Sequence, residues 1–139
     1  MDEVVDSTCR RQLTLNEPIR VGMVGCGLIA QVMHLPYLNE LEERFEVTAL
    51  CDLSETVAAG CARGYGVARV HTRWPDLLSE DLDAVMVLTS GDHAPIAIAA
   101  ARAGIHVFAE KPMALSARDG AVMIDAARTT RDAVLKSLR

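Results

Sequence analysis

The sequence predicts a doubly wound α/β fold, in which helices cover both faces of a mostly parallel sheet. The first observation is an apolar, β-branched run, IRVGMVG at 19–25, which ends in glycine and is typical of a strand buried on both faces. The second is that further apolar runs alternate with segments of helical character. The third is that the connections are short and that 139 residues make one ordinary domain.

The expected elements follow one another without a gap that would mark a domain boundary. Helical character over 28–34 lasts until Pro36, which either kinks this helix or starts a second short piece through Leu41. A second strand is expected over 45–51. The next elements are a helix capped by Ser54 and ended at Gly64 or Gly66, a strand over 68–71, a short helix opened by Trp74 and Pro75, a strand over 84–90, a helix over 95–104 closed by Gly104, and a strand over 106–110.

The last part of the chain predicts one more helix. Ser116 and Asp119 fit an N-terminal capping box. The apolar residues expected to lie largely on one face of this helix are Ala121, Val122, Ile124 and Ala127. The run AVLK at 133–136 fits either a strand or a helical continuation, because so few residues show no periodicity.

Composition excludes several classes of function. A net charge of -5 and the lack of a long basic run argue against a nucleic-acid surface. No run approaches the roughly 20 apolar residues of a membrane span, so no membrane partner is expected. The chain is expected to bind small molecules as a soluble protein, with a homo-oligomer as one option.

The N-terminus and the cysteines indicate a cytoplasmic location. Residues 1–18 start acidic and lack a basic segment followed by an apolar block, so they predict a flexible leader rather than a secretory signal. The domain is expected over 19–139. The four cysteines, at positions 9, 26, 51 and 61, form neither a CxxC pair nor a ligand cluster, which favours reduced thiols and no bound metal.

The segment GCGLIA after the first strand carries the strongest chemical signal. It places Gly25, Gly27 and Ala30 in the GxGxxG/A pattern of a Rossmann dinucleotide site. Gly25 permits a tight turn, Gly27 lets a pyrophosphate approach the backbone, and the small Ala30 lets the helix pack on the strand. The amides near Leu28 and Ile29 are then expected to face the phosphates at the helix N-terminus.

Asp52, directly after the second strand, fits the carboxylate that accepts hydrogen bonds from the adenosine ribose hydroxyls. A carboxylate there repels a 2'-phosphate, and no arginine follows immediately, so NAD(H) is favoured over NADP(H). The alternative is that Asp52 caps the helix that begins near Ser54, a role compatible with binding.

Several separated segments resemble the Gfo/Idh/MocA oxidoreductases, the family of glucose-fructose oxidoreductase and inositol dehydrogenase. They are IRVGMVGCGLIAQVMHLPYL at 19–38, ALCD at 49–52, and DAVMVLTSGDHAPIAIAAARAGIHVFAEKPMALS at 83–116. The most distinctive is AGIHVFAEKPMA, in which a strand delivers Glu110, Lys111 and Pro112 to the carboxyl edge of the sheet. The resemblance implies that Glu110 helps to place the cofactor, that Lys111 lies near the nicotinamide and the reacting oxygen, and that the bond before Pro112 is cis. Lys111 is therefore the candidate catalytic residue, able to stabilise an alkoxide or relay a proton.

The loop after the 84–90 strand departs from the family pattern, which has a Thr-Pro-Asn-like stretch followed by a histidine. Thr89 and Ser90 still fall at the ligand-facing strand end, although Ser90 replaces the usual proline and the loop is one residue shorter. For His93, helix capping and a pocket role both remain open. His34, which matches an HxP segment of the family, is expected to be structural, and Cys26 to pack as a small hydrophobe.

The resemblance also implies a second α/β domain that supplies the substrate pocket and the acid/base groups, and this domain is expected to be absent here. The first hypothesis is therefore an NAD(P)-binding domain of an oxidoreductase that transfers a hydride between nicotinamide and a hydroxyl-bearing sugar or cyclitol, inactive or incomplete alone. The second is a non-enzymatic module that binds dinucleotide or assembles through an apolar surface. A SAM-dependent methyltransferase fits poorly, because Glu110, Lys111 and Pro112 have no part in that chemistry.

Overall fold

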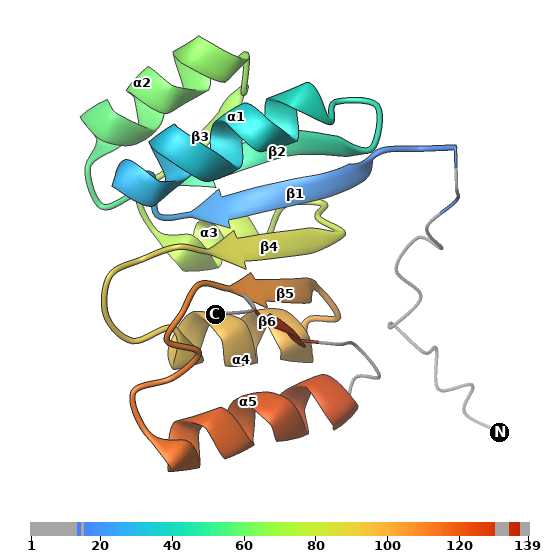
Figure 1. The fold of residues 1–139 in the computed structure, drawn as a ribbon, viewed down its shortest axis with the longest axis vertical. Helices are drawn as coiled ribbons and strands as arrows, with labels where there is room; N and C mark the ends of the chain where they lie inside the picture. The colour runs from blue at the N-terminus through green and yellow to red at the C-terminus, as the bar shows by residue number, and fades with distance from the viewer. Residues whose placement is uncertain (1–13, 15, 130–133, 137–139) are drawn as a thin grey trace, which may run out of the picture.

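The predicted doubly wound α/β fold is confirmed (Figure 1). The computed structural model describes residue 14, residues 16–129 and residues 134–136. Within these residues six strands form one sheet in the order β3-β2-β1-β4-β5-β6, and every neighbouring pair is parallel. The chain adds strands on one side of β1 up to β3 and then on the other side from β4 onwards, so the topological switch point lies between β1 and β4. Doubly wound sheets bind their ligands at this point.

The elements fall close to their expected positions, with several bounds corrected. The strand expected over 84–90 ends at Val87, and the ambiguous run at 133–136 contains a strand. The strands are β1 Ile19–Val24, β2 Phe45–Cys51, β3 Arg69–His71, β4 Ala84–Val87, β5 His106–Ala109 and β6 Val134–Lys136. The helices are the π-helix η1 Ala30–His34 and the α-helices α1 Leu35–Glu40, α2 Glu55–Tyr65, α3 Trp74–Leu78, α4 Ala94–Arg102 and α5 Ala117–Thr129.

Alternate residues of the strands face two separate hydrophobic cores. On one face Val24, Val85 and Val107 pack with residues of α3, α4 and α5. On the other face Met23 and Leu50 pack with residues of η1, α1 and α2. Because side chains alternate along a strand, the near-continuous apolar runs of the sequence supply both cores at once.

The predicted helix ends are largely confirmed. The Ser54 hydroxyl accepts from the Val57 amide at 3.3 Å, and Gly66 ends α2 in the left-handed conformation with a φ of 68°. The Ser116 hydroxyl accepts from the Asp119 amide at 3.1 Å. Pro36 lies in the first turn of α1, so it starts a second helical piece, where its missing N–H costs no hydrogen bond.

The buried face of α5 differs from the expected one. Its buried residues are Met123, Ala126 and Ala127, whereas Ala121 and Val122 are exposed. Residues 121 and 122 lie about 100° apart on a helix, so they cannot both share a face with residue 127. The packing against α4 and the sheet selects the side that carries Met123.

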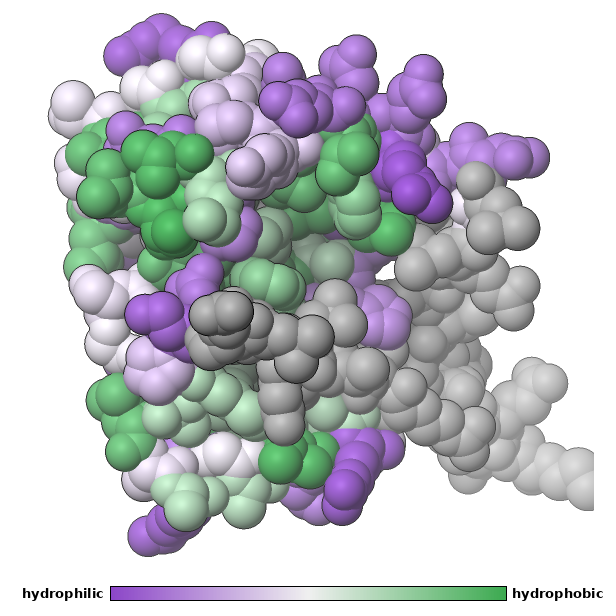
Figure 2. Space-filling model, in the orientation of Figure 1, coloured by the Kyte–Doolittle hydropathy of each residue, from purple (hydrophilic) through white to green (hydrophobic). Residues whose placement is uncertain are grey.

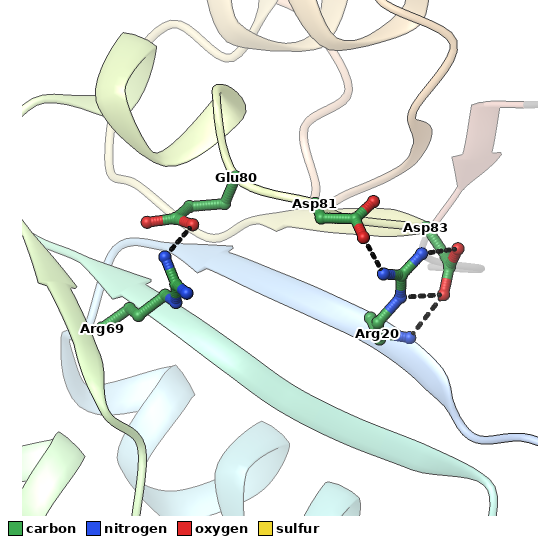
Figure 3. A network of polar contacts seen from close by, with 5 residues as sticks. All are labelled: Arg20, Arg69, Glu80, Asp81 and Asp83. Carbon is green, nitrogen blue, oxygen red and sulfur yellow. Dashed lines mark hydrogen bonds and ion pairs between the residues drawn. The ribbon is translucent and has the colours of Figure 1, made fainter. Parts of the chain in front are cut away.

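Charged side chains tie the strands together at the amino edge of the sheet (Figure 3). Asp83, before β4, accepts from the Arg20 backbone N–H at 2.9 Å and from its Nε and Nη2 at 3.2 and 3.1 Å. Arg20 also pairs with Asp81, while Glu80 accepts from Arg69 Nη1 and contacts His71 Nε2. The hydrogen bond to Asp83 raises the pKa of Arg20, so the guanidinium stays charged at any ordinary pH. No helix in the described part of the chain is long and apolar enough to cross a membrane.

Candidate functional site

A cleft opens at the carboxyl ends of the central strands. These strand ends point to the left in Figure 1. Its volume is about 730 Å³, which is in the range of a small-molecule site. The cleft is lined by Val24, Gly25, Gly27, Cys51, Asp52, Leu53, Thr72, Arg73, Trp74, Pro75, Leu88, Thr89, Ser90, Asp92 and Ile96. Of the predicted cofactor residues, it thus brings together Gly25, Gly27, Asp52, Thr89 and Ser90.

Gly25 occupies a position that only glycine fits. Its φ is +99°, and a Cβ placed there would lie 2.8 Å from the Leu88 carbonyl carbon and 2.9 Å from the Thr89 nitrogen. The end of β1 therefore touches the chain that leaves β4, and this contact forms the floor of the cleft. Gly25 also donates its N–H to the Cys51 carbonyl at 2.8 Å, which ties the turn to β2.

Gly27 differs, because a Cβ there would meet nothing within 4 Å. Its lack of a side chain thus leaves open space in the cleft rather than relieving a contact within the protein. Ala30, the first residue of η1, is fully buried in the core on that face of the sheet, which fits its predicted packing role. Leu28 is 77 % exposed and Ile29 is half-buried, and neither side chain lines the cleft.

The Asp52 carboxylate joins the glycine turn to the start of α2. Its Oδ2 accepts from the Cys26 amide and its Oδ1 from the Ser54 amide, both at 2.9 Å. Asp52 therefore bonds to the backbone just before α2 and also lines the cleft. A carboxylate oxygen can accept two hydrogen bonds, so each oxygen of Asp52 has capacity left for a hydroxyl group of a ligand.

The cysteine inside the turn packs as expected. Cys26 is fully buried, and its thiol lies 3.7 Å from the Cys51 carbonyl oxygen. Burial raises the pKa of Cys26 to about 12 and that of Cys51 to about 11, so both thiols stay protonated at neutral pH. A buried thiol is a poor nucleophile, which supports a packing role.

His93 is buried beneath the loop rather than open to the cleft. Its Nε2 donates to the Thr89 carbonyl oxygen, and its Nδ1 is buried with no partner in the described part of the chain. His93 precedes α4, but its side chain does not cap the helix. Asp92 takes that task, because its Oδ1 accepts from the Ala94 amide at 3.0 Å. The side chain of His93 therefore shapes the loop that carries Thr89 and Ser90.

Glu110 and Lys111 lie at the same edge of the sheet, beyond the cleft lining. Glu110 follows β5, and its N–H donates to the Val87 carbonyl of β4 at 3.0 Å. Its carboxylate meets His34 Nε2 at 3.1 Å, while Lys111 is exposed. The peptide bond between Lys111 and Pro112 is cis, as the sequence resemblance implied.

Two sets of contacts escaped the sequence analysis. His34 is packed and hydrogen-bonded, in line with the structural role expected for it, but the sequence did not identify its partners: its Nε2 lies 3.1 Å from the Glu110 carboxylate, and its ring packs edge-on against Phe108 at a centroid distance of 5.6 Å. Arg73 and Thr72 line the cleft although they lie outside the glycine motif. Their position directly after the short β3 strand was the available signal, because the carboxyl ends of parallel strands share one edge.

The fold and the cleft define a dinucleotide-binding domain: a 3-2-1-4-5-6 parallel sheet, a glycine turn after β1 and a carboxylate after β2. A family model described as an oxidoreductase family with an NAD-binding Rossmann fold matches residues 19–136. The chain belongs to this family, the Gfo/Idh/MocA oxidoreductases, and forms its NAD(P)-binding domain.

Known relatives support this assignment. Inositol 2-dehydrogenase 3 of Saccharopolyspora erythraea is 37% identical over 110 residues, which are 78% of this chain and 32% of that protein. Among solved structures, the WlbA dehydrogenase of Bordetella pertussis in complex with NADH and UDP-GlcNAcA has a TM-score of 0.81 and 32% identity, over 86% of this chain and 37% of that one. KijD10, a 3-ketoreductase of Actinomadura kijaniata in complex with TDP-benzene and NADP, has a TM-score of 0.79 and 35% identity, over 86% and 38%. The chain spans about a third of the length of the curated relatives it matches.

Proposed function

We propose that this domain holds a nicotinamide dinucleotide for hydride transfer to or from a hydroxyl-bearing carbon of a sugar or cyclitol. The observation that carries the proposal is that one cleft is lined by Gly25, Gly27 and Asp52 together. The substrate class follows from relatives that act on inositol and on nucleotide-linked sugars. About two thirds of each relative lies outside the match, so groups that complete the chemistry are expected to come from outside this domain.

In the proposed complex, different residues hold different parts of the cofactor. The open space over Gly27 accommodates the pyrophosphate, with the amides of residues 27–30 as donors at the N-terminal end of the helical segment. Asp52 accepts from the adenosine ribose hydroxyls, and Thr89 and Ser90 contact the part of the cofactor nearer β4. His93 supports this loop from below. NAD(H) is the preferred cofactor, because the Asp52 carboxylate repels a 2'-phosphate.

Lys111 is the proposed catalytic group. When bound, the nicotinamide supplies or accepts the hydride. An exposed ammonium after β5 is free to stabilise negative charge on the substrate oxygen or to hold its proton, while the carboxylate of Glu110, held by His34, fixes the segment that carries it. The test is the rate of turnover with NAD and a panel of polyols, measured with the domain and any partner that restores activity. Lys111→Ala should lower this rate at least about a hundredfold. An unchanged rate would remove this role.

Calorimetric titration tests cofactor binding directly. NADH is expected to bind the wild-type domain, and Asp52→Ala is expected to weaken NADH more than NADPH, because the carboxylate grips the ribose hydroxyls but repels a phosphate. Since Asp52 also holds the Cys26 amide, part of the loss will be common to both cofactors, and the ratio of affinities is the readout. Asp52→Asn keeps one acceptor oxygen without the charge, and Asp125→Ala, an exposed carboxylate on α5, is the matched control. No binding of either nucleotide at millimolar concentration would refute the proposal.

A second candidate function is assembly through an apolar surface. Exposed hydrophobic side chains lie on and beside η1 and α1. Figure 2 shows apolar surface at the position that η1 has in Figure 1. They are Leu28, Val32, Met33, Tyr37 and Leu41. Light scattering at several protein concentrations would test assembly. A homo-oligomer that dissociates in Val32→Glu would support it, and a monomer at all concentrations would oppose it. A cytoplasmic location remains part of the proposal, supported by the free thiols of Cys26, Cys51 and Cys61.

A further inference from the structure

The adenosine end of the cleft carries a positive charge that lies far from the glycine motif in the sequence. Arg73 follows β3, the edge strand that pairs with β2. The Asp52 N–H donates to the His71 carbonyl at 3.2 Å, so the chain leaving β3 passes beside the residue that ends β2. Arg73, Thr72 and Asp52 consequently line the same cleft.

The Arg73 guanidinium is not engaged elsewhere in the described part of the chain. Its side chain is exposed, and the ion pairs of the neighbouring arginines involve other carboxylates, since Arg20 pairs with Asp81 and Asp83 and Arg69 with Glu80. The Arg73 backbone is fixed instead, because its carbonyl accepts from the Asp76 and Leu77 amides at the start of α3. The arginine thus has a fixed base, and its charged end remains available to a ligand.

A guanidinium at this point changes the electrostatics that Asp52 alone would impose. A lone carboxylate beside the ribose repels a 2'-phosphate. A guanidinium presents a planar set of donors that binds phosphate oxygens in pairs, and here it adds a positive charge to the cleft that Asp52 also lines. A ribose hydroxyl gains little from the extra positive charge, whereas a phosphate gains a charge-assisted hydrogen bond.

We infer that Arg73 is a second determinant of cofactor specificity beside Asp52, and that it binds the ribose 2'-phosphate of NADP(H). Asp52 favours NAD(H), Arg73 favours NADP(H), and the domain accepts both. This inference rests on the proposed function, because it requires the adenosine ribose to lie beside Asp52. It differs from that function in assigning selectivity to two opposed charges from neighbouring strands.

Titration of four proteins with two cofactors tests the inference. Arg73→Ala is expected to weaken NADPH by about tenfold or more, the usual effect of losing a hydrogen bond to a charged group, and NADH by less than about twofold. Arg63→Ala removes another exposed arginine, on α2 and outside the cleft lining, so it controls for the general loss of positive charge. Asp52→Asn is expected to shift the ratio in the opposite direction. The fragments 2',5'-ADP and 5'-AMP should repeat the pattern without the nicotinamide half.

The outcomes separate this inference from the proposed function. Equal losses of NADH and NADPH in Arg73→Ala would overturn it, since they would indicate that the guanidinium stacks on the adenine common to both. A wild-type domain that binds NADH but not NADPH would also overturn it and leave the proposed function intact. A domain that binds neither cofactor would overturn both.

Discussion

Gly25 and Gly27 belong to one motif, but the structure gives them different physical reasons to be glycine. Gly25 needs a positive φ and room for the backbone of Leu88 and Thr89. Gly27 has ordinary backbone angles and faces open space in the cleft. The fold therefore requires the first glycine, whereas no contact within the protein requires the second, which leaves room for the proposed ligand.

Alanine at each of the two positions should separate these requirements. Gly25→Ala is expected to lower the free energy of unfolding by about 2 to 4 kcal/mol, since a strained φ adds to a backbone clash. Gly27→Ala should change stability by less than about 1 kcal/mol and weaken NADH at least tenfold, because the added Cβ enters the space of the pyrophosphate. Urea unfolding and calorimetry measure both. Unchanged NADH affinity in Gly27→Ala would contradict the placement of the pyrophosphate.

The buried thiols make stability depend on pH in the alkaline range. The pKa of Cys26 is raised from 9.0 to about 12 by burial, so the folded state keeps a proton that the unfolded state loses above pH 9. The contribution of Cys26 to stability is complete below pH 9 and is lost as the pH rises towards 12.

Between pH 9 and 11 the free energy of unfolding should fall faster in the wild type than in Cys26→Ala. The difference in slope is expected to reach at most about 1.4 kcal/mol per pH unit, the value for one proton. Urea titrations at pH 8, 9.5 and 10.5 measure it. The readout is the slope of the unfolding free energy against pH, because the packing lost in the variant lowers that free energy equally at every pH. Cys51→Ala, whose thiol has a pKa of about 11, should flatten the slope in the same direction. Parallel lines for all three proteins would contradict the assignment.

At the scale of elements, the two edges of the sheet have separate tasks. The carboxyl edge carries the glycine turn, Asp52 and Glu110, and His34 of η1 connects across it to the segment after β5. The amino edge carries the ion pairs of Figure 3, where Asp83, just before β4, bonds to Arg20 at the start of β1. Function gathers at one edge and stability at the other, because parallel strands present all their carboxyl ends on one side.

Removal of Asp83 should therefore destabilise the domain without altering the cleft. The Asp83 side chain is 5% exposed and accepts three hydrogen bonds from Arg20, so Asp83→Ala leaves a largely buried guanidinium short of partners. A loss of about 2 to 4 kcal/mol is expected by urea unfolding. The matched control is Asp81→Ala, because that carboxylate is 83% exposed and its loss should cost less than about 1 kcal/mol. Similar losses in the two variants would show that burial does not decide the strength of these pairs.

At the scale of the whole molecule, the cleft lies at the edge of a sheet that has a hydrophobic core on each face. One face of the sheet carries α3, α4 and α5, and the other carries η1, α1 and α2. The cleft lies where the connections diverge to the two faces, between β1 and β4. A ligand bound there touches segments that follow four strands, so its binding should stabilise the fold as a unit.

Saturating NADH is accordingly expected to raise the midpoint of thermal unfolding. A ligand at a hundred times its dissociation constant adds about 2.7 kcal/mol, which corresponds to several degrees for a domain of this size. Differential scanning calorimetry with NADH, and with adenosine as a ligand that lacks the phosphates, measures this effect. Equal shifts for both ligands would indicate that the phosphates are not held by the turn at residues 25–30.

The sequence by itself determined the class of fold, the glycine turn, the carboxylate at 52 and the family, since these depend on local patterns of strand, turn and helix. It also located Glu110, Lys111 and the caps at Ser54 and Ser116. Only the tertiary structure decided which side of α5 is buried, that His34 meets Glu110, that His93 lies beneath its loop, and that Arg73 reaches the cleft beside Asp52. Most of these contacts join residues from different elements, and a local sequence pattern does not indicate which elements the sheet brings together.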